Sequence, residues 1–499
     1  MSAITPRQSL VARNTAYNII GQLIATLIGV VAIPVISHGL GASRFGLLAL
    51  IWVIYGQFAA LDLGLGRATT KFVGEYLARG DETQVRLVAT LSVVCQTMLG
   101  VLSGALLALL TPTLLHRVLH VAPALDAEAR GAFLYLALSV PFVVLSLSLR
   151  AILEAAQRFD LVNLIRTPSG AVVFVVPAVA ALFGGSLPLI VLLLLATRIA
   201  TCWATNWAIR RALPSFRWEL RISWPMLRPL LRFGSWVAVS NVVSPVLGYL
   251  ERFVLGSLVG LSAVAYYVAP FEGVTRLLVV PVSLATALFP ALSSALARGE
   301  NVQPLVSRSL RYLLLTLAAP VFVITALSRD LLNLWLGPVY AAQGAAALSI
   351  LAVGVLINAL AHVPYVYLLG KGRPDLPAKF QLLELPLYFL AAWLLIGALG
   401  VTGAAAAWTL RVTLDAVLLC LAMGRRSEVS PRALLGARGG RAVAVVALLT
   451  VAMLGSRFAP SGLAGRIPVA AAVSIGFGVA VWRFVLDDAE RAGLRRVFT

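Results

Sequence analysis

The chain carries little charge for its length. Of its 499 residues only 12% are Asp, Glu, Lys or Arg, whereas 60% are hydrophobic, and the mean hydropathy is +0.94. Soluble domains contain about 25% charged and about 45–50% apolar residues. This shortage of charge excludes a water-soluble chain of several globular domains and indicates membrane-spanning segments instead.

Cysteine and histidine are also scarce. Cys95, Cys202 and Cys420 all fall inside apolar segments without paired spacing, which excludes a disulfide framework and a zinc site. His116 and His120 are four residues apart, a spacing that can hold a metal, but no third ligand lies near them in the sequence. We therefore expect no metal and no cofactor.

The sequence lacks the motifs of an energy-converting or catalytic domain. No G-x-x-x-x-G-K-[ST] stretch is present, so the chain does not carry its own P-loop ATPase. The predicted outer loops are short, the longest covering about residues 111–130, and none is large enough to fold alone. We therefore expect no enzyme and no catalytic residues, and a function carried by helices inside the membrane.

Apolar runs, in contrast, occur throughout the chain. A helix needs roughly 20 apolar residues to cross the hydrocarbon layer, and lipid cannot satisfy the backbone polar groups of other structures. We predict an all-α polytopic membrane protein of about 14 transmembrane helices. The predicted segments are 14–37, 46–66, 87–110, 131–152, 168–184, 187–208, 233–258, 262–290, 311–336, 343–369, 380–397, 401–423, 441–457 and 463–484.

Lysine and arginine are distributed unevenly over the predicted loops. One side, which includes both termini, holds thirty of these cations and the other side holds six. The six are Arg44, Arg117, Arg130, Arg329, Arg457 and Arg466. Because cytoplasmic loops carry the excess, we predict that both termini are cytoplasmic. The net charge of +20 then faces anionic lipid rather than nucleic acid, and segment 209–232, rich in Arg and Trp, is predicted to lie along the membrane surface.

Two short stretches recur at nearly the same offset. Residues 41–48 (GASRFGLL) are similar to residues 260–267 (GLSAVAYY), and residues 158–161 (RFDL) are similar to residues 373–376 (RPDL). The offsets are 219 and 215 residues, and each match falls at the same place in a six-helix unit. We predict two homologous lobes, 1–212 and 213–425, followed by two additional helices and a cytoplasmic tail in 426–499. Such repeats are typical of transporters, whose substrate site lies between the halves.

Motifs at the helix ends resemble those of a known family, the polysaccharide transporter branch of the superfamily that also contains MATE-fold multidrug extruders. The similar stretches are 62–67 (DLGLGR) with Lys71 and 74–75 (GE), 157–160 (QRFD), 251–256 (ERFVLG) with 265–267 (AYY), and 289–293 (FPALS). They cover roughly residues 10–425. One departure is Glu251, which stands where Asp is commoner in the family, although the charge is kept.

This resemblance implies two pseudo-symmetric six-helix lobes around a central cavity. It further implies translocation of undecaprenyl-pyrophosphate-linked oligosaccharide across the bacterial inner membrane. The implied partners are that lipid-linked substrate, the membrane lipids, and a polysaccharide polymerase with its chain-length machinery.

Arginines inside the predicted spans are the main candidates for binding the anionic head group. They are Arg198, Arg252, Arg276 and Arg411. Ionisable residues within a membrane are costly and are therefore functional candidates, and the planar guanidinium can bond two phosphate oxygens at once. Arg198 has no acid nearby in sequence and is the best candidate, the alternative being an acidic partner on another helix.

The other three arginines have acidic neighbours in sequence. Arg276 follows Glu272 by four residues and Arg411 precedes Asp415 by four, so either could form a structural pair on one helix face. Arg252 adjoins Glu251, but neighbouring helical side chains point about 100° apart. A cross-helix pair and a substrate contact therefore both stay open for Arg252.

Polar residues in the first span are further candidates. Asn14, Asn18 and Gln22 are four residues apart, and Asn241 sits at the equivalent place in the second half. This stripe either lines the cavity for glycan hydroxyls or makes hydrogen bonds between helices. Near the inner face, Asp62, Lys71 and Glu75 form either a gate or a solvated loop end.

The energy source is left open by the sequence. Without an ATPase, the candidates are a gradient of H⁺ or Na⁺ and removal of the product. The candidate residues for ion coupling or gating are Asp62, Lys71, Glu251, Glu272, Glu384 and Asp415. A multidrug or cation antiporter of the MATE type is the alternative function, and it predicts acid-rich cavities. A membrane-embedded glycosyl- or acyltransferase is a further alternative, but it needs a catalytic His or acid cluster that we do not find.

Overall fold

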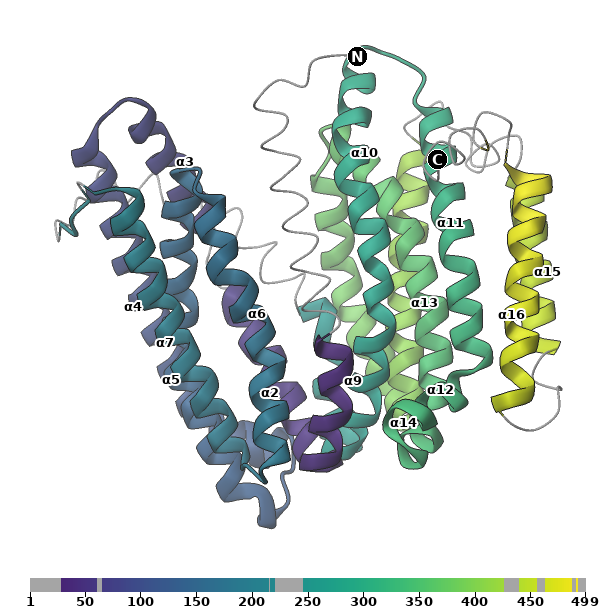
Figure 1. Cartoon of the computed structure of the whole chain (residues 1–499), viewed down its shortest axis with the longest axis horizontal. Coiled ribbons are helices and arrows are strands. Elements are labelled where there is room, and N and C mark those ends of the chain that lie inside the picture. Colours follow the sequence, from purple (N-terminus) through teal and green to yellow (C-terminus); the bar gives the residue numbers. More distant parts are fainter. Residues whose placement is uncertain are drawn as a thin grey trace. The chain divides into compact units, whose positions relative to one another are not determined.

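The structure, a computed structural model, describes residues 28–60, 65–214, 216–219, 246–425, 439–455, 463–486 and 491. In these ranges all regular structure is helical (Figure 1). Nine of the described helices are long and apolar enough to cross a membrane, and shorter apolar helices cover Ile28–Leu40, Ala42–Phe58 and Gly440–Ala452. The chain is a multi-pass, all-α membrane protein, as the hydropathy of the sequence predicted.

Helices cover every predicted span in the described residues. The first is Ile28–Leu40, and an unlabelled helix covers 246–258. The others are α2 (Ala42–Ala60), α3 (Leu65–Ala78), α4 (Glu82–Thr113), α5 (Pro123–Ala155), α6 (Phe159–Leu182), α7 (Leu187–Ala212), α9 (Leu261–Thr275), α10 (Val279–Ala297), α11 (Gln303–Ala326), α12 (Ser328–Leu336), α13 (Pro338–Gly370), α14 (Asp375–Arg425), α15 (Gly439–Gly455) and α16 (Leu463–Ala480). The short π-helix η1 (Leu114–Val118), 3₁₀-helix η2 (Arg276–Leu278) and π-helix η5 (Val481–Val485) extend or link them.

Several helices begin earlier or end later than hydropathy indicated. Helix α6 begins at Phe159 rather than near residue 168, and α5 continues to Ala155. The single segment expected over 311–336 is instead two helices, α11 and α12. Helix α14 runs through both segments predicted at 380–397 and 401–423, and it breaks between them at Gly400, where φ is 56° and ψ is −127°. Only glycine adopts this backbone conformation readily.

The chain packs as two compact units, Met1–Ala265 (unit 1) and Tyr266–Thr499 (unit 2), each described here by itself. The boundary falls inside α9, about fifty residues beyond the lobe boundary proposed from the repeat. The helix over residues 246–258 therefore packs with unit 1. The division into lobes at 1–212, 213–425 and 426–499 stays a prediction.

Each unit is built around apolar clusters between its helices. In unit 1 a cluster from α3, α4, α5, α6 and α7 includes the buried Phe216, with Trp218 packed against it. In unit 2 one cluster joins α10, α11, α13 and α14, and a second holds α15 and α16 against α11. The two C-terminal helices predicted from the sequence are therefore part of unit 2.

The segment after α7 folds back onto unit 1. The indole nitrogen of Trp218 donates to the side-chain oxygen of Asn206 (3.1 Å), and the backbone amide of Glu219 donates to the Thr90 hydroxyl (3.1 Å). The Glu219 carboxylate also lies 3.8 Å from the Arg86 guanidinium. These contacts attach the start of the predicted surface segment to the helix ends, while its residues 220–232 lie outside the described part of the chain.

The repeated stretches occupy equivalent positions. Gly41 and Gly260 both have positive φ values, 76° and 117°, and directly precede α2 and α9. Arg158 donates through Nε and Nη2 to both carboxylate oxygens of Asp160, at 2.9 and 2.8 Å, and Arg373 does the same to Asp375 at 2.8 and 2.9 Å. The same two-oxygen clasp thus opens α6 in unit 1 and α14 in unit 2, which supports an origin of the two halves by duplication.

A related clasp closes the turn between α10 and α11. The guanidinium of Arg298 bonds the Glu300 carboxylate, and this hydrogen bond lowers the pKa of Glu300 below its usual range. Glu300 is therefore ionised at neutral pH. Charged pairs of this kind fix short turns where the helices leave the apolar layer.

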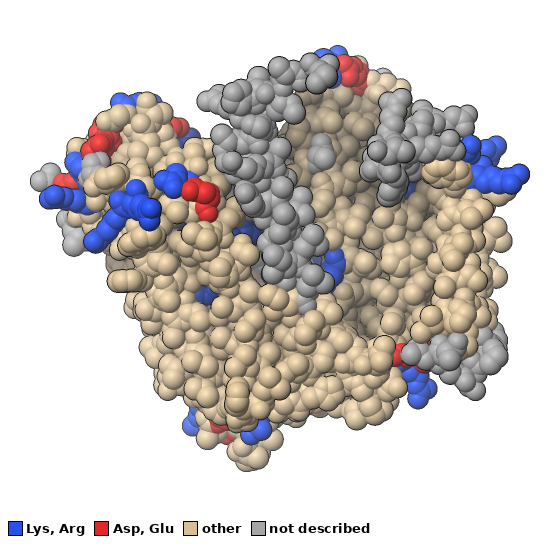
Figure 2. All heavy atoms as spheres, viewed as in Figure 1, with Lys and Arg blue, Asp and Glu red and all other residues tan. Residues whose placement is uncertain are grey.

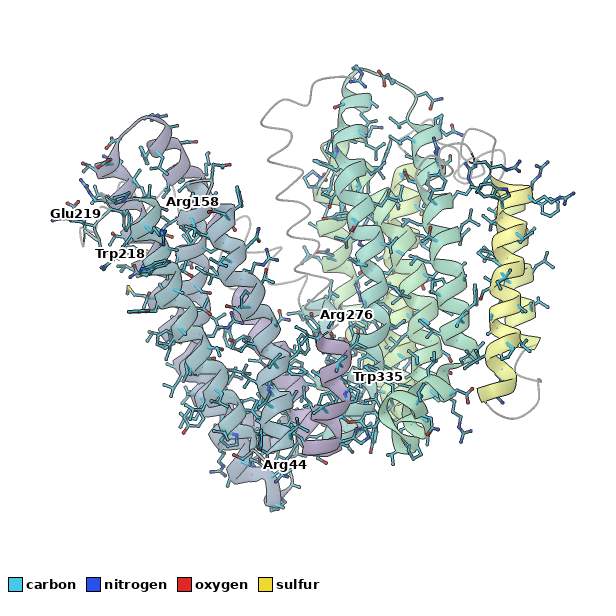
Figure 3. All side chains as sticks on the ribbon, in the orientation of Figure 1. Arg44, Arg158, Trp218, Glu219, Arg276 and Trp335 are labelled. Atoms are coloured by element: carbon cyan, nitrogen blue, oxygen red, sulfur yellow. The ribbon has the colours of Figure 1, made fainter. Side chains whose placement is uncertain are left out.

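Charges gather at the helix ends and are sparse along the walls between them (Figure 2). In unit 1, Arg44 and Arg158 lie at opposite ends (Figure 3). Arg44 pairs with Glu128 (2.8 Å), whose other oxygen accepts from the backbone amide of Leu187 (2.8 Å), so this end joins α2, α5 and α7. Which face of the membrane each end meets stays a prediction from the sequence.

Close helix contact in unit 1 depends on glycine. A Cβ added at Gly104 on α4 would lie 2.5 Å from the carbonyl oxygen of Ala137 on α5. We expect Gly104→Ala to force the helices apart and to lower stability by about 1–3 kcal/mol, the usual cost of overpacking. Thermal unfolding of the purified protein in detergent measures the change.

Gly74→Ala on α3 is the matched control, because nothing lies within 4 Å of the added Cβ. This change should be neutral or stabilising by up to about 1 kcal/mol, since alanine favours helix. Equal unfolding temperatures for the two variants would contradict the packing role of Gly104.

Candidate functional site

A cavity of about 280 Å³ with apolar walls and several polar side chains lies within unit 1. Helices α5, α6 and α7 form most of its wall, and Tyr55 and Gly56 of α2 complete it. Three arginines line it, Arg150 from α5, Arg166 from α6 and Arg198 from α7. No acidic residue is among the described residues of the lining. A cationic cavity of this kind is suited to an anionic group.

Arg198 is held by an aromatic partner rather than by an acid. Its Nε donates to the hydroxyl of Tyr55, and its guanidinium carbon lies 4.7 Å from the centre of that ring. Among the described residues no carboxylate pairs with Arg198, so the alternative of an acidic partner on another helix finds no support there. A guanidinium over an aromatic face keeps its full charge and is stabilised by the ring quadrupole. The remaining donors of Arg198 are available to a ligand in the cavity.

Arg150 and Arg166 were not singled out from the sequence, where both were counted among the cations of the cytoplasmic side. Arg150 stands at the end of the predicted span 131–152, and Arg166 lies in a helix because α6 begins earlier than hydropathy indicated. Arg150 pairs with Glu154 one turn along α5 at 3.1 Å. Arg166 is exposed and makes no ion pair with any described residue. In the sequence, the signal for both arginines was that they flank the 157–160 motif, sixteen residues apart. This spacing does not show that their side chains line one cavity.

Hydroxyl groups add neutral acceptors to the cavity, because each donates its own proton to a backbone carbonyl of its helix. Ser146, Ser169, Thr201 and Thr205 line it beside the arginines. The Ser169 and Thr201 hydroxyls are 3.0 Å apart and connect α6 to α7. Chemically, the cavity presents two or three positive charges and several hydroxyls, a set that can bind phosphate oxygens and sugar hydroxyls together.

Unit 2 contains a separate cluster of buried charge. Glu384, which is 1% exposed, lies 3.6 Å from the Arg411 guanidinium across the Gly400 break of α14. The spacing in sequence had indicated Asp415 as the partner of Arg411, but the ion pair in the structure is with Glu384. The two arms of α14 fold against one another, which sequence spacing alone does not show.

Asp415 belongs to the same cluster. It interacts electrostatically with Glu384, Arg411 and His362, and Arg411 also lies over the Tyr388 ring at 5.6 Å. Neither carboxylate oxygen of Glu384 makes a well-aligned hydrogen bond to a described residue. Two carboxylates and one guanidinium away from water leave an excess of acid, which a proton or a small cation can neutralise.

The two remaining span arginines are paired with the acids beside them. Arg252 is 2% exposed and lies 4.0 Å from Glu251, and its guanidinium carbon is 4.7 Å from the Tyr249 ring centre. Arg276 donates to Glu272 at 3.5 Å and begins the 3₁₀ turn η2 between α9 and α10. Their roles toward a substrate, and those of Glu251 and Glu272 toward an ion, stay predictions.

Lys71 and Glu75, the other predicted site residues that the structure describes, are not brought to either cluster. Lys71 is exposed on α3 and lies over the Phe72 ring at 5.3 Å, and Glu75 is exposed on the same helix. Asn18, Gln22, Asn241 and Asp62 lie outside the described residues.

Solved structures of similar fold are transporters. The chain superposes on a structure described as "Lipid II flippase MurJ, inward closed conformation" with a TM-score of 0.74 and 13% identity, over 94% of this chain and 99% of the other. An inward-facing multidrug resistance MATE family transporter of the MOP superfamily gives a TM-score of 0.68 at 17% identity, over 80% and 94% of the two chains. At these identities the likeness establishes the fold, which is that of the MATE and MurJ proteins.

Sequence comparison then identifies the family. Residues 11–296 match the family described as "Polysaccharide biosynthesis protein", and the chain belongs to this family. A "Putative O-antigen transporter" of Shigella flexneri is 28% identical over 416 residues, which is 82% of this chain and 96% of that protein. "Uncharacterized membrane protein EpsK" of Bacillus subtilis is 22% identical over 375 residues, 71% and 70% of the two chains. The resemblance recognised from the helix-end motifs is confirmed.

Breaking the buried pair of unit 2 should cost stability. Arg411→Gln leaves Glu384 beside Asp415 without its cation, and removing one partner of a buried pair costs about 3–5 kcal/mol. Thermal unfolding in detergent should show this loss, whereas the double variant Arg411→Gln with Glu384→Gln should recover much of it, because no unpaired buried charge then remains on Glu384. Additive losses in the double variant would contradict a direct interaction between the two side chains.

Proposed function

We propose that this protein is a flippase for undecaprenyl-pyrophosphate-linked oligosaccharide, the repeat unit of a surface polysaccharide. It would move this lipid-linked glycan across the bacterial inner membrane by alternating access of its two lobes. The observation that carries the proposal is the cavity of unit 1, whose described lining holds Arg150, Arg166 and Arg198 and no acidic residue, although Glu154 outside the lining pairs with Arg150. Membership of the polysaccharide biosynthesis family and the name of the Shigella relative support the same substrate class.

The chemistry of the substrate explains the composition of the cavity. A pyrophosphate and a glycan cannot cross hydrocarbon unaided, because transfer of an ionised group out of water costs far more than any single contact returns. Guanidinium groups supply charge-assisted hydrogen bonds for the phosphates, and the hydroxyls supply partners for the sugar. A cavity of about 280 Å³ accommodates part of a head group, and the lipid tail stays in the bilayer.

The proposal also includes the orientation of the protein in the membrane and its partners. Both termini would be cytoplasmic, in keeping with the excess of lysine and arginine on that side. Arg158, near the cavity arginines in sequence, lies at the cytoplasmic end of unit 1 in this orientation, and Arg44 lies at the outer end (Figure 3). The partners would be membrane lipids, the lipid-linked substrate, and the polymerase that consumes it with its chain-length machinery.

The alternative functions fit the cavity less well. A MATE-type antiporter of organic cations shares the fold, but it needs acidic residues in its cavity, and the described lining of this one is cationic. A glycosyl- or acyltransferase needs catalytic residues, and relatives named as transporters or flippases do not favour it.

We further propose that the cluster of Glu384, Asp415 and Arg411 couples transport to an ion gradient. Its excess carboxylate, held away from water in unit 2, is suited to binding a proton or Na⁺. Binding and release of that ion would change the charge between the two arms of α14. Glu272, in contrast, has its own arginine one turn away.

Arg198→Ala should slow transport strongly while the protein still inserts and folds. Losing a hydrogen bond to a charged group costs about 1.5–3 kcal/mol, so binding should weaken roughly 10–100-fold. Proteoliposomes that contain the full chain and a labelled undecaprenyl-pyrophosphate oligosaccharide measure flipping as the fraction of label accessible from outside. Arg198→Lys keeps the charge without the planar fork and should give an intermediate rate.

Arg210→Ala is the matched control, because Arg210 is exposed on the same helix but lies outside the cavity lining. It should flip substrate at the rate of the unchanged protein. Full activity of Arg198→Ala, or equal losses in both variants, would remove the cavity from the mechanism.

Glu384→Gln should uncouple flipping from the driving gradient. The neutral amide cannot gain or lose a proton, so the rate should no longer respond when a pH or Na⁺ gradient is imposed across the proteoliposomes. Glu300→Gln is the control, because Glu300 lies in the turn clasp with Arg298 and stays ionised. An unchanged gradient response in Glu384→Gln would rule out this cluster as the coupling site.

A further inference from the structure

A second arginine-lined pocket lies in unit 2, at one end of the helices. It has a volume of about 430 Å³ and is bounded by the end of α11, the first turn of α12, α13 and the start of α16. Its polar lining residues are Ser328, Arg329, Ser349 and Arg466, and the remainder is apolar and mostly alanine. The cavity and coupling residues proposed above do not take part in it. Arg329 and Arg466 belong to the small set of cations that the sequence places on the outer side.

Arg466 builds the pocket by joining α16 to α12. Its Nη1 donates to the Asp330 carboxylate at 3.0 Å. Its Nε is buried and has no hydrogen-bond partner among the described residues. A buried donor without an acceptor costs free energy, so a ligand that supplies an oxygen there would be stabilised. The carboxylate of Asp330 offsets one of the two positive charges.

Arg329 supplies the second guanidinium. It is exposed and makes no ion pair with any described residue. It lies in the first turn of α12, whose N-terminus has no side-chain cap. The amide groups at a helix N-terminus carry partial positive charge and favour anions. The uncapped N-terminus of α12 and the guanidinium of Arg329 therefore both favour an anion in the pocket.

Ser328 adds a buried donor to the same lining. Its side chain is 7% exposed, and its oxygen accepts a hydrogen bond from the Ser349 hydroxyl at 2.9 Å. The Ser349 hydroxyl also lies 3.1 Å from the carbonyl oxygen of Ala345, so its single proton can go there while Ser328 donates to Ser349. Hydroxyl hydrogens rotate to suit their acceptors, so this pair can turn one O–H toward an anionic oxygen in the pocket.

The surroundings of the pocket identify the ligand class. Only 11% of the apolar membrane-spanning stretch of α16 is buried within the protein, so most of this stretch lies on the surface of unit 2. The pocket lies where the ends of α11, α12 and α16 meet, and the ends of membrane-spanning helices reach the head-group region. Its small alanine side chains leave space beside the arginines. Phosphate is the anion that a guanidinium fork matches best.

We propose that this pocket binds the phosphate of an anionic phospholipid. Arg329, Arg466 and Ser328 would bond the phosphate oxygens, and the acyl chains would run along α16 and α13. The bound lipid would strengthen the attachment of α15 and α16 to the rest of unit 2, because it bridges α16 and α12. This site is independent of the cargo cavity in unit 1, so its test needs no transport measurement.

The experiment measures lipid retention by the delipidated full-length protein in detergent, by native mass spectrometry with added phosphatidylglycerol. Arg329→Ala should lower the affinity about tenfold or more, as expected for one charge-assisted hydrogen bond pair. Arg466→Ala should lower it further, and Arg466→Lys, which keeps a cation opposite Asp330, should lower it less. Phosphatidylglycerol should also raise the thermal unfolding temperature of the unchanged protein but not that of Arg329→Ala.

Arg441→Ala is the control, because Arg441 is exposed at the other end of the α15–α16 pair and lies outside the pocket. It should retain phosphatidylglycerol as the unchanged protein does. Equal retention in Arg329→Ala, or equal retention of zwitterionic phosphatidylcholine, would overturn the proposal. Stabilisation by inorganic phosphate alone, or tighter binding of undecaprenyl phosphate at these arginines, would overturn the assignment to a phospholipid.

Discussion

A charge inside hydrocarbon has to meet a counter-charge, a polar group or water, because no other arrangement repays the loss of its hydration. The described spans satisfy this condition in different ways. Arg411 meets a buried carboxylate, Arg198 meets the ring and hydroxyl of a tyrosine, and Arg166 is exposed beside the cavity that it lines. Charges at the helix ends meet one another across short turns, as Arg373 and Asp375 do. The tyrosine contact leaves the Arg198 guanidinium available to a ligand, whereas the carboxylate contact of Arg411 does not leave that guanidinium available.

Hydropathy predicted the helical membrane fold because the cost of exposing backbone groups to lipid acts on every segment alike. It did not predict where helices end, since helices continue past the apolar layer. Arg166 was therefore assigned to a loop although it lies in α6. The pairing of Arg411 with Glu384 depends on the break at Gly400, a tertiary feature that an i,i+4 spacing cannot reveal. Arg198 was found because a lone cation in the middle of a span is visible in sequence.

The two units place their charges differently, although short motifs recur along the chain. Each occurrence of these motifs keeps the positive-φ glycine before a helix and the arginine–aspartate clasp at a helix start, so these features serve the backbone. In unit 1 the arginines line a cavity without a described acid in its lining, whereas in unit 2 Arg411 is outnumbered by Glu384 and Asp415. One helical fold therefore holds a cationic cavity in one unit and an acidic cluster in the other.

The break at Gly400 also constrains how unit 2 can move. Its two arms are joined by a very short connection and linked again by the Glu384–Arg411 contact, so they resist sliding or splaying. In contrast, the helix through α9 and α10 passes through a 3₁₀ turn at Arg276, where the regular ladder of backbone hydrogen bonds is interrupted. Bending is easier there than within α14. Any conformational change within unit 2 would therefore bend the chain at the 276–278 turn, while the two arms of α14 move together as one rigid body.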